Sequence, residues 1–336
     1  MKPFLFFISL FATILNGYCQ TSKEYIKNGK IKVRQQDYKG AIEDYTNAIK
    51  IEPENVRAYF NRGLAKDNLQ DYTGAIEDYT KAIKIEPENI KAYYNRGLAK
   101  DNLQDYAGAI EDYTKALQFS PKEVAALNNR GLSKDKIKDY KGAIEDFSKA
   151  IEINPSDSYP FYNRGRSKHK IEDYKGAIDD FSKSIEIQSN NGSAYILRGN
   201  SKAGLYEYKS AIEDYAKAIE ININDPEAYY NRGLAKANLL DYKGSIDDFS
   251  SSIKLNPDEP DAYTFRGLIK AEIHDYSGTI EDLTKSIEIN PRNPINYFNR
   301  GLAKIKIDQK ESACKDFNIA KELGIDVSKQ KEQYCK

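Results

Sequence analysis

The chain has 336 residues, and its 51 basic side chains are balanced by 51 acidic ones. Such neutrality argues against a dedicated nucleic-acid-binding protein, which needs surplus lysine and arginine to displace phosphate counterions. Its 26 tyrosines and 13 phenylalanines make it too aromatic for an intrinsically disordered chain, while two histidines and three cysteines leave little material for a metal site or an imidazole-based catalytic centre.

The segment 1–19 is typical of an export signal. A basic residue is followed by an apolar run over 4–15, and the small residues Gly17 and Cys19 stand three and one positions before Gln20. We expect cleavage after Cys19 and a periplasmic or secreted protein. Two alternatives stay open: lipidation of Cys19, which would tether the protein to a membrane face, and an uncleaved interfacial anchor.

The rest of the chain repeats with a period of 34 residues. Nine copies follow one another without insertion or deletion: 22–55, 56–89, 90–123, 124–157, 158–191, 192–225, 226–259, 260–293 and 294–327. Glycine occupies the eighth position of every copy: Gly29, Gly63, Gly97, Gly131, Gly165, Gly199, Gly233, Gly267 and Gly301. A period of this length indicates a solenoid, in which each copy buries its apolar face against its neighbours.

Each copy is predicted to be a helical hairpin. In 90–123, small and apolar residues recur with helical spacing in two runs. Asp105 can cap the second run, and Pro121 ends it because proline cannot continue the hydrogen-bond pattern. Gly97 and Ala109 are small where the two helices should cross closely.

These residues resemble the signature of the tetratricopeptide repeat family. In the second copy the matching residues are Tyr59, Gly63, Leu69, Tyr72, Ala75, Tyr79, Ala82 and Pro87. The resemblance covers all nine copies and implies an all-α fold, an αα-superhelix of helix-turn-helix repeats. In this family the first helices line a concave groove that holds peptides or partner proteins. The related pentatricopeptide RNA readers have a longer period and basic surfaces, so the neutral charge argues against that relationship.

Charged residues recur at three positions of the repeat. Position 7 is arginine in eight copies, while position 11 is lysine and position 23 aspartate in all nine. Positions 7 and 11 are one helical turn apart, and position 23 lies at a similar height on the second helix. We therefore expect an Arg–Asp ion-pair ladder that sets the stacking register, with lysine head groups reaching water. As exposed pairs they would contribute only about 0 to 1 kcal/mol each. The expected pairs include Arg62 with Asp78, Arg96 with Asp112, and Arg130 with Asp146.

By analogy with the family, positions 2, 5, 9, 12 and 13 face the concave side. Position 5 is mostly aromatic and position 9 mostly leucine, so we expect an apolar strip that binds the partner. Its members are Phe60, Leu64, Tyr94, Leu98, Leu132, Tyr162, Tyr230, Leu234, Leu268, Phe298 and Leu302. Burial of these side chains against the next repeat is the open alternative. The carboxylate-gripping clamp of some relatives needs lysine at position 5 and asparagine at position 9, and is not supported.

Position 2 changes its charge along the chain. It is basic at Lys23, Arg57 and Lys91, and acidic at Glu227 and Asp261. Such a gradient could orient a partner with oppositely charged ends, although chance variation explains it equally well.

Two cysteines mark the C-terminal end. In an oxidising compartment, Cys314 and Cys335 could form a disulfide. By closing the loop between them, this bond would stabilise the folded state by about 3 kcal/mol. Two free thiols are the alternative. The segment 328–336 is expected to cover the exposed face of the last repeat.

The sequence therefore predicts a non-catalytic scaffold that binds a protein or an extended peptide in its groove. It contains no phosphate-binding glycine loop, zinc-ligand spacing or nucleophile elbow. We expect no catalytic residue, metal or cofactor, no nucleic-acid partner, and membrane contact only through an N-terminal anchor. The alternative is an accessory or regulatory domain of an envelope-associated enzyme or assembly complex.

Overall fold

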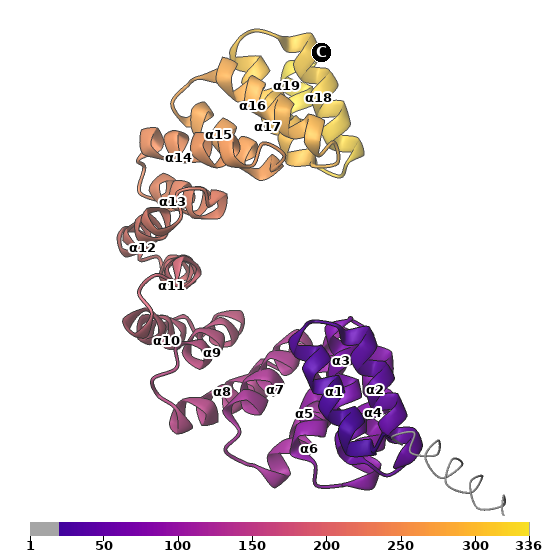
Figure 1. The fold of residues 1–336 in the computed structure, drawn as a ribbon. Coiled ribbons are helices and arrows are strands. Elements are labelled where there is room, and N and C mark those ends of the chain that lie inside the picture. The colour runs from indigo at the N-terminus through magenta and orange to yellow at the C-terminus, as the bar shows by residue number, and fades with distance from the viewer. Residues whose placement is uncertain (1–19, 336) are drawn as a thin grey trace, which may run out of the picture. The chain divides into compact units, whose positions relative to one another are not determined.

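The computed structural model describes residues 20–335, so the expected export signal at 1–19 lies outside the described residues. The described residues form 19 α-helices and no strand (Figure 1). The chain divides after Pro155 into two compact parts, which we call the N-terminal block and the C-terminal block. None of the helices between residues 20 and 335 combines the length and apolar character that crossing a bilayer requires.

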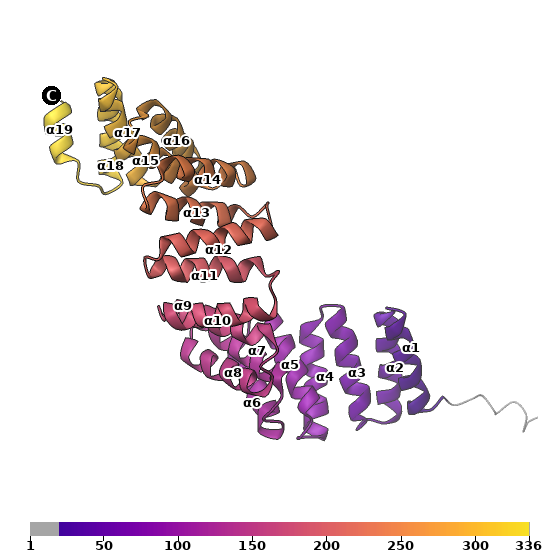
Figure 2. The same cartoon turned by 90° about the vertical axis from the view of Figure 1, so that its left-hand side faces the viewer.

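The N-terminal block is a stack of four helical hairpins. Its helices are α1 (Ser22–Arg34), α2 (Tyr38–Ile51), α3 (Val56–Asn68), α4 (Tyr72–Ile85), α5 (Ile90–Asn102), α6 (Tyr106–Phe119), α7 (Val124–Lys136) and α8 (Tyr140–Ile153). Within this block each odd-numbered helix packs against the next even-numbered helix, which in turn packs against the next hairpin (Figure 2). Successive first helices also touch, α1 with α3, α3 with α5, and α5 with α7.

The C-terminal block continues the same pattern over five hairpins and a short last helix. Its helices are α9 (Ser158–Lys170), α10 (Tyr174–Ile187), α11 (Gly192–Gly204), α12 (Tyr208–Ile221), α13 (Pro226–Asn238), α14 (Tyr242–Leu255), α15 (Pro260–Glu272), α16 (Tyr276–Ile289), α17 (Pro294–Lys306), α18 (Lys310–Glu322) and α19 (Ser328–Tyr334). The segment expected to cover the last repeat forms α19, which packs on α18. Cys314 of α18 and Cys335 form a disulfide.

The turn between the two helices of a hairpin follows from its sequence. In the third repeat, Asp105 N–H donates to Lys100 O at 2.9 Å and Gln104 N–H to Asp101 O at 2.9 Å, the Schellman pattern of a helix end. Gln104 has a φ of 62°, in the left-handed region that this motif requires. Asp105 Oδ1 then accepts a hydrogen bond from Gly108 N at 3.0 Å, so the predicted cap of the second helix is confirmed.

Glycine at position 8 makes room for an aromatic ring on the second helix. The Tyr113 ring is buried so close to Gly97 that an added Cβ would lie 2.7 Å from its Cε1. The same ring-on-glycine contact joins Tyr79 to Gly63 and Phe147 to Gly131. A larger residue at position 8 would separate the two helices, which explains the regular spacing of these glycines.

In the third repeat, buried charge joins the two helices of the hairpin and links them to the preceding hairpin. Asp112 is 2% exposed and accepts two hydrogen bonds from Arg96, from Nε at 2.9 Å and from Nη2 at 2.6 Å. Lys100 Nζ lies 2.9 Å from the same carboxylate and donates to Gly108 O at 3.3 Å. Arg96 Nη1 donates to Thr80 Oγ1 of the preceding repeat at 2.9 Å. One arginine therefore joins three helices, α4, α5 and α6.

Equivalent contacts recur throughout the described repeats. The Arg–Asp distances are 2.6–2.7 Å in eight repeats, including Arg62–Asp78 and Arg130–Asp146, and the Lys–Asp distances are 2.7–2.9 Å in all nine. Two details of the sequence-based expectation are wrong. The lysine amines bind the ladder carboxylates instead of extending freely into solvent, and their side chains are only partly exposed. The carboxylates themselves are buried because the helix pair closes over them.

We expect Asp112→Asn to destabilise α5 and α6 by about 3 kcal/mol, because two buried cations lose their counterion. Hydrogen exchange of the α5 and α6 amides measures the free energy of local opening. The control is Glu111→Gln, which removes an exposed charge from the neighbouring position. Equal exchange in the two variants would contradict the structural role assigned to the buried carboxylate.

One repeat lacks the bond to its predecessor. Arg198 Nη1 donates to Ser182 Oγ at 3.1 Å and Arg266 Nη1 to Ser250 Oγ at 2.9 Å. Arg232 binds Asp248 through Nε and Nη2, but the equivalent residue of its preceding repeat is Ala216, which has no hydroxyl.

We expect Ala216→Ser to stabilise the α12–α13 contact by about 1 kcal/mol, the usual contribution of one hydrogen bond. Hydrogen exchange in these two helices should slow. Ser182→Ala is the matched converse and should speed exchange in α10 and α11. Suppose that Ala216→Ser left amide exchange in α12 and α13 unchanged while Ser182→Ala accelerated exchange in α10 and α11. The hydroxyl would then stabilise one repeat contact but not the other, which would contradict the prediction.

Candidate functional site

The aromatic residues at position 5 rest on the buried rings of their own repeats. Phe60 lies 5.8 Å from Tyr79 between ring centroids, and Tyr94 lies 5.8 Å from Tyr113. In the C-terminal block the equivalent pairs are Tyr162–Phe181 at 6.0 Å, Tyr230–Phe249 at 5.7 Å and Phe298–Phe317 at 6.1 Å. Each of these five rings is half-buried, with one part on the core and another part accessible.

The leucines at position 9 continue this surface one helical turn further along. Leu64 packs with Phe60 around Tyr79, and Leu64, Leu98, Leu132, Leu234, Leu268 and Leu302 are all partly exposed. Within each block, we call these leucines, together with the position-5 rings, the aromatic–leucine strip. Both sequence-based alternatives were too simple, because the strip is neither fully exposed nor fully buried.

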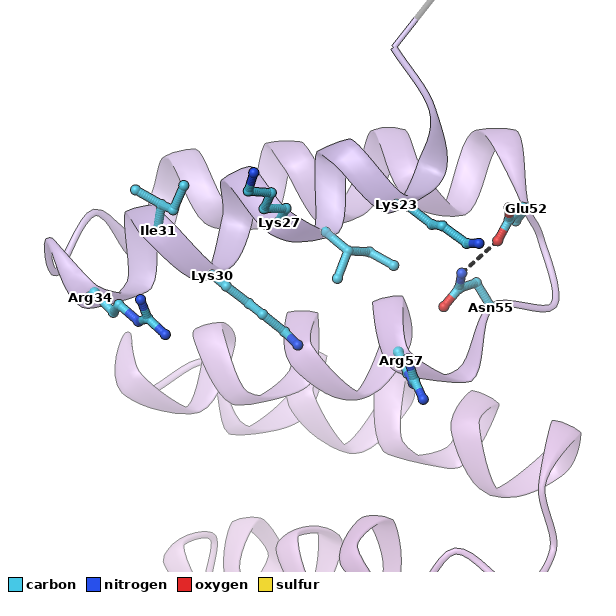
Figure 3. A pocket seen from close by; sticks show the side chains of 9 residues that line it. Lys23, Lys27, Lys30, Ile31, Arg34, Glu52, Asn55 and Arg57 are labelled. Atoms are coloured by element: carbon cyan, nitrogen blue, oxygen red, sulfur yellow. Dashed lines mark hydrogen bonds between the residues drawn. The ribbon is translucent and has the colours of Figure 1, made fainter.

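Two neighbouring hollows lie in the N-terminal block. The first, about 560 Å³, lies between α1 and the start of α3 and is lined by Lys23, Lys30, Arg57 and four further cationic or apolar residues of α1 (Figure 3). The second, about 480 Å³, shares Lys30 and Arg57 and adds Phe60 and Lys91. The basic residues of position 2 therefore gather around one part of the binding surface.

The C-terminal block has a hollow of opposite charge. It measures about 360 Å³ and is lined by Glu227, Tyr230, Glu259 and Asp261 among others. Burial, reinforced by Asp261 and Glu259, raises the pKa of Tyr230 to about 12, so its hydroxyl stays neutral at physiological pH.

A further hollow of about 430 Å³ in the same block is polar but uncharged. It is lined by His169, Asn200, Tyr215 and Leu234, together with other residues of α9 to α13. Burial lowers the pKa of His169, whose Nδ1 lies 2.9 Å from Ser201 Oγ. The ring is consequently a neutral hydrogen-bonding group at pH 7.

Two carboxylates beneath the strip were missed by the sequence analysis. Tyr79 Oη donates to Asp67 Oδ2, and Tyr113 Oη donates to Asp101 Oδ2 at 2.7 Å. Burial is the main cause that raises the pKa of both aspartates. Ser133 donates a further hydrogen bond to Asp101 at 2.7 Å. Aspartate at position 12 opposite tyrosine at position 24 was the available signal.

The aspartates of position 23 are engaged with lysine, and in eight repeats also with arginine. Across residues 20–335 no group of three His, Cys, Asp or Glu side chains is placed to hold a metal ion. What the surface offers is a row of half-buried apolar side chains with charged hollows beside it.

Models of one repeat family match the chain at many places. A TPR repeat model matches residues 29–67, 68–101 and 207–239. Two tetratricopeptide repeat models match 90–123 and 124–157, and 160–191 and 226–259. Together the matches cover more than half of the chain.

Solved structures of repeat proteins share the fold. The C-terminal part of a TPR repeat-containing protein from Cytophaga hutchinsonii is 18% identical, with a TM-score of 0.61 over 70% of this chain and 97% of that one. A tetratricopeptide repeat protein from Parabacteroides merdae is 21% identical, with a TM-score of 0.55 over 74% and 99%. YrrB, described as a TPR protein with an unusual peptide-binding site, is 24% identical, with a TM-score of 0.50 over 56% and 96%. No curated protein sequence matches the chain significantly.

Proposed function

Because the chain belongs to the tetratricopeptide repeat family, whose members bind proteins or peptides, we propose that it is a non-catalytic scaffold that binds an extended polypeptide segment along its aromatic–leucine strip. The observation that carries this proposal is the half-burial of the strip. Rings such as Tyr94 and Tyr230 are fixed from below by Tyr113 and Phe249, so they lose little conformational freedom when a ligand covers them.

The energetics favour a polypeptide over a small molecule. A row of partly exposed aromatic and leucine side chains provides many modest contacts, each worth about 25 cal/mol per Å² of apolar area removed from water. An extended segment with alternating side chains can cover several repeats at once, whereas a metabolite would fill only one hollow. The surrounding polar residues then set orientation and specificity.

We expect Leu98→Glu and Leu234→Glu each to weaken binding about tenfold or more, since a carboxylate would have to be desolvated in the strip. Peptides of 12 residues selected from a displayed library against the wild-type protein serve as ligands, and fluorescence anisotropy measures their Kd. Each variant is tested with peptides that bind its own block, and circular dichroism confirms that helicity is kept.

Leu240→Glu is the control for this experiment. Leu240 is 70% exposed and lies in the hairpin turn, at the position that Glu172 occupies in the fifth repeat. It should leave every Kd unchanged. If the selected peptides bind Leu98→Glu, Leu234→Glu and Leu240→Glu as tightly as the wild type, the aromatic–leucine strip is not the binding surface.

We also propose that the protein is exported and that its signal is cleaved after Cys19. The disulfide between Cys314 and Cys335 supports this proposal, because such bonds persist in oxidising compartments. Mass spectrometry of the mature protein is expected to find Gln20 at the N-terminus. A lipid-modified Cys19 would instead support a membrane tether, and an intact Met1 would contradict cleavage.

A further inference from the structure

The hollow between α1 and the start of α3 has a strong excess of positive charge. Lys23, Lys27, Lys30 and Arg34 follow one another along α1 at intervals of four, three and four residues, and Arg57 faces them from α3. In Figure 3, Lys30 extends from α1 toward α3, and Lys23 points toward the Glu52–Asn55 pair. Glu52 is the one carboxylate of the lining, and it accepts a hydrogen bond from Asn55 Nδ2 at 2.6 Å.

None of these cations forms an ion pair in the part of the chain that the structure describes. The ion pairs between residues 20 and 335 include Lys32, Lys66 and Lys100 but none of the five basic residues of this hollow. Five positive charges around one space of about 560 Å³ repel one another. An anionic ligand would reduce this electrostatic repulsion and would itself be attracted to the cations. The neighbouring hollow extends the basic surface to Lys91.

We propose that this hollow binds an extended polypeptide segment with acidic side chains at alternate positions. The inference rests on the proposed scaffold function and names the chemistry of the ligand at its N-terminal end. Cationic residues four apart on α1 are separated by about 6 Å along the helix axis. The three-residue step from Lys27 to Lys30 is shorter, about 4.5 Å. Alternate residues of an extended peptide are about 6.6 Å apart, so their carboxylates would lie beside the cations that are four residues apart.

The lining distinguishes a polypeptide from other anions. Its apolar lining consists of Ile26, 9% exposed, and Ile31, 42% exposed. This hollow holds no aromatic residue, although Phe60 lines the neighbouring one. Single-stranded nucleic acid binds to basic grooves through aromatic side chains on which its bases stack. An anionic membrane presents a flat surface, whereas these cations surround a recess. Aliphatic side chains flanking acidic ones suit the isoleucine lining.

The chemistry also differs from recognition of a chain end. The basic residues spread over about 16 Å of α1, which corresponds to about five residues of extended peptide. A single terminal carboxylate would neutralise only one end of this row. Several side-chain carboxylates are required to balance the charge of the whole hollow.

The test uses a fluorescein-labelled decapeptide of alternating glutamate and alanine, with the glutamine–alanine peptide as its neutral partner. Anisotropy measures Kd for the full chain and for the double variant Lys30→Glu/Arg57→Glu. Both residues are exposed, and Glu227 occupies the position of Arg57 in the seventh repeat, so folding should be retained. The control is Lys39→Glu/Lys81→Glu, which makes the same charge change at exposed positions outside the hollow.

We expect the acidic peptide to bind the wild type at least about tenfold more tightly than the neutral one, and the Lys30/Arg57 variant to lose about tenfold or more. The control variant should stay within about twofold, and raising the salt concentration should weaken binding by the wild type. Equal losses in the two double variants would overturn the proposal, because they would indicate only a general charge effect. So would tighter binding of an oligothymidylate or of phosphatidylserine vesicles than of the acidic peptide.

Failure here is distinguishable from failure of the scaffold function. Library-selected peptides could lose affinity for the Leu98→Glu variant while the acidic peptide binds the wild type and the Lys30→Glu/Arg57→Glu variant with the same Kd. In that case only the assignment of this hollow is wrong. If neither the selected nor the acidic peptide binds, both proposals fail.

Discussion

A carboxylate buried between two helices and shared by an arginine and a lysine is the interaction on which eight of the nine described repeats depend. Asp112 is almost inaccessible, and both of its oxygens are occupied by Arg96 and Lys100. Removing three charged groups from water is costly, so such a cluster stabilises the fold only when its geometry is complete. The bidentate contact, the lysine bond to Gly108 O and the hydroxyl of the preceding repeat together complete it. The buried cluster therefore favours one arrangement of neighbouring hairpins, and this effect outweighs its contribution to the total free energy of unfolding.

The periodic features of the fold could be predicted because each depends on a few residues within one repeat. Gly97 opposite Tyr113 and the Asp105 cap are local relationships that a 34-residue period makes visible. The burial of the Lys100 amine against Asp112 could not be predicted from the repeat pattern. A lysine on a helix surface normally extends its amine into water, and only the closure of α5 on α6 places that amine against Asp112.

The sequence and the family resemblance suggested which residues form the aromatic–leucine strip, but they did not predict how deeply these residues are buried. Family geometry places Tyr94 and Leu98 on the inner face, yet the depth of burial depends on how far Tyr113 rises beneath them. The same holds for Asp101, whose hydrogen bonds to Tyr113 and Ser133 join parts of two repeats. Pattern analysis treats each position separately, whereas burial and pKa result from contacts between repeats.

The ladder and the binding surface use different positions of the same helices, and this separation allows one to vary while the other is kept. On α3, Arg62 and Lys66 are committed to Asp78, while Arg57 is free of ion pairs among the described residues. On α1 the separation is sharper still. Asn28 stands where the other repeats have arginine, so Lys32 alone pairs with Asp44, and the remaining cations of the helix gather at the hollow. A repeat that uses fewer cations for its own stacking can present more of them to the ligand that we propose for the hollow between α1 and α3.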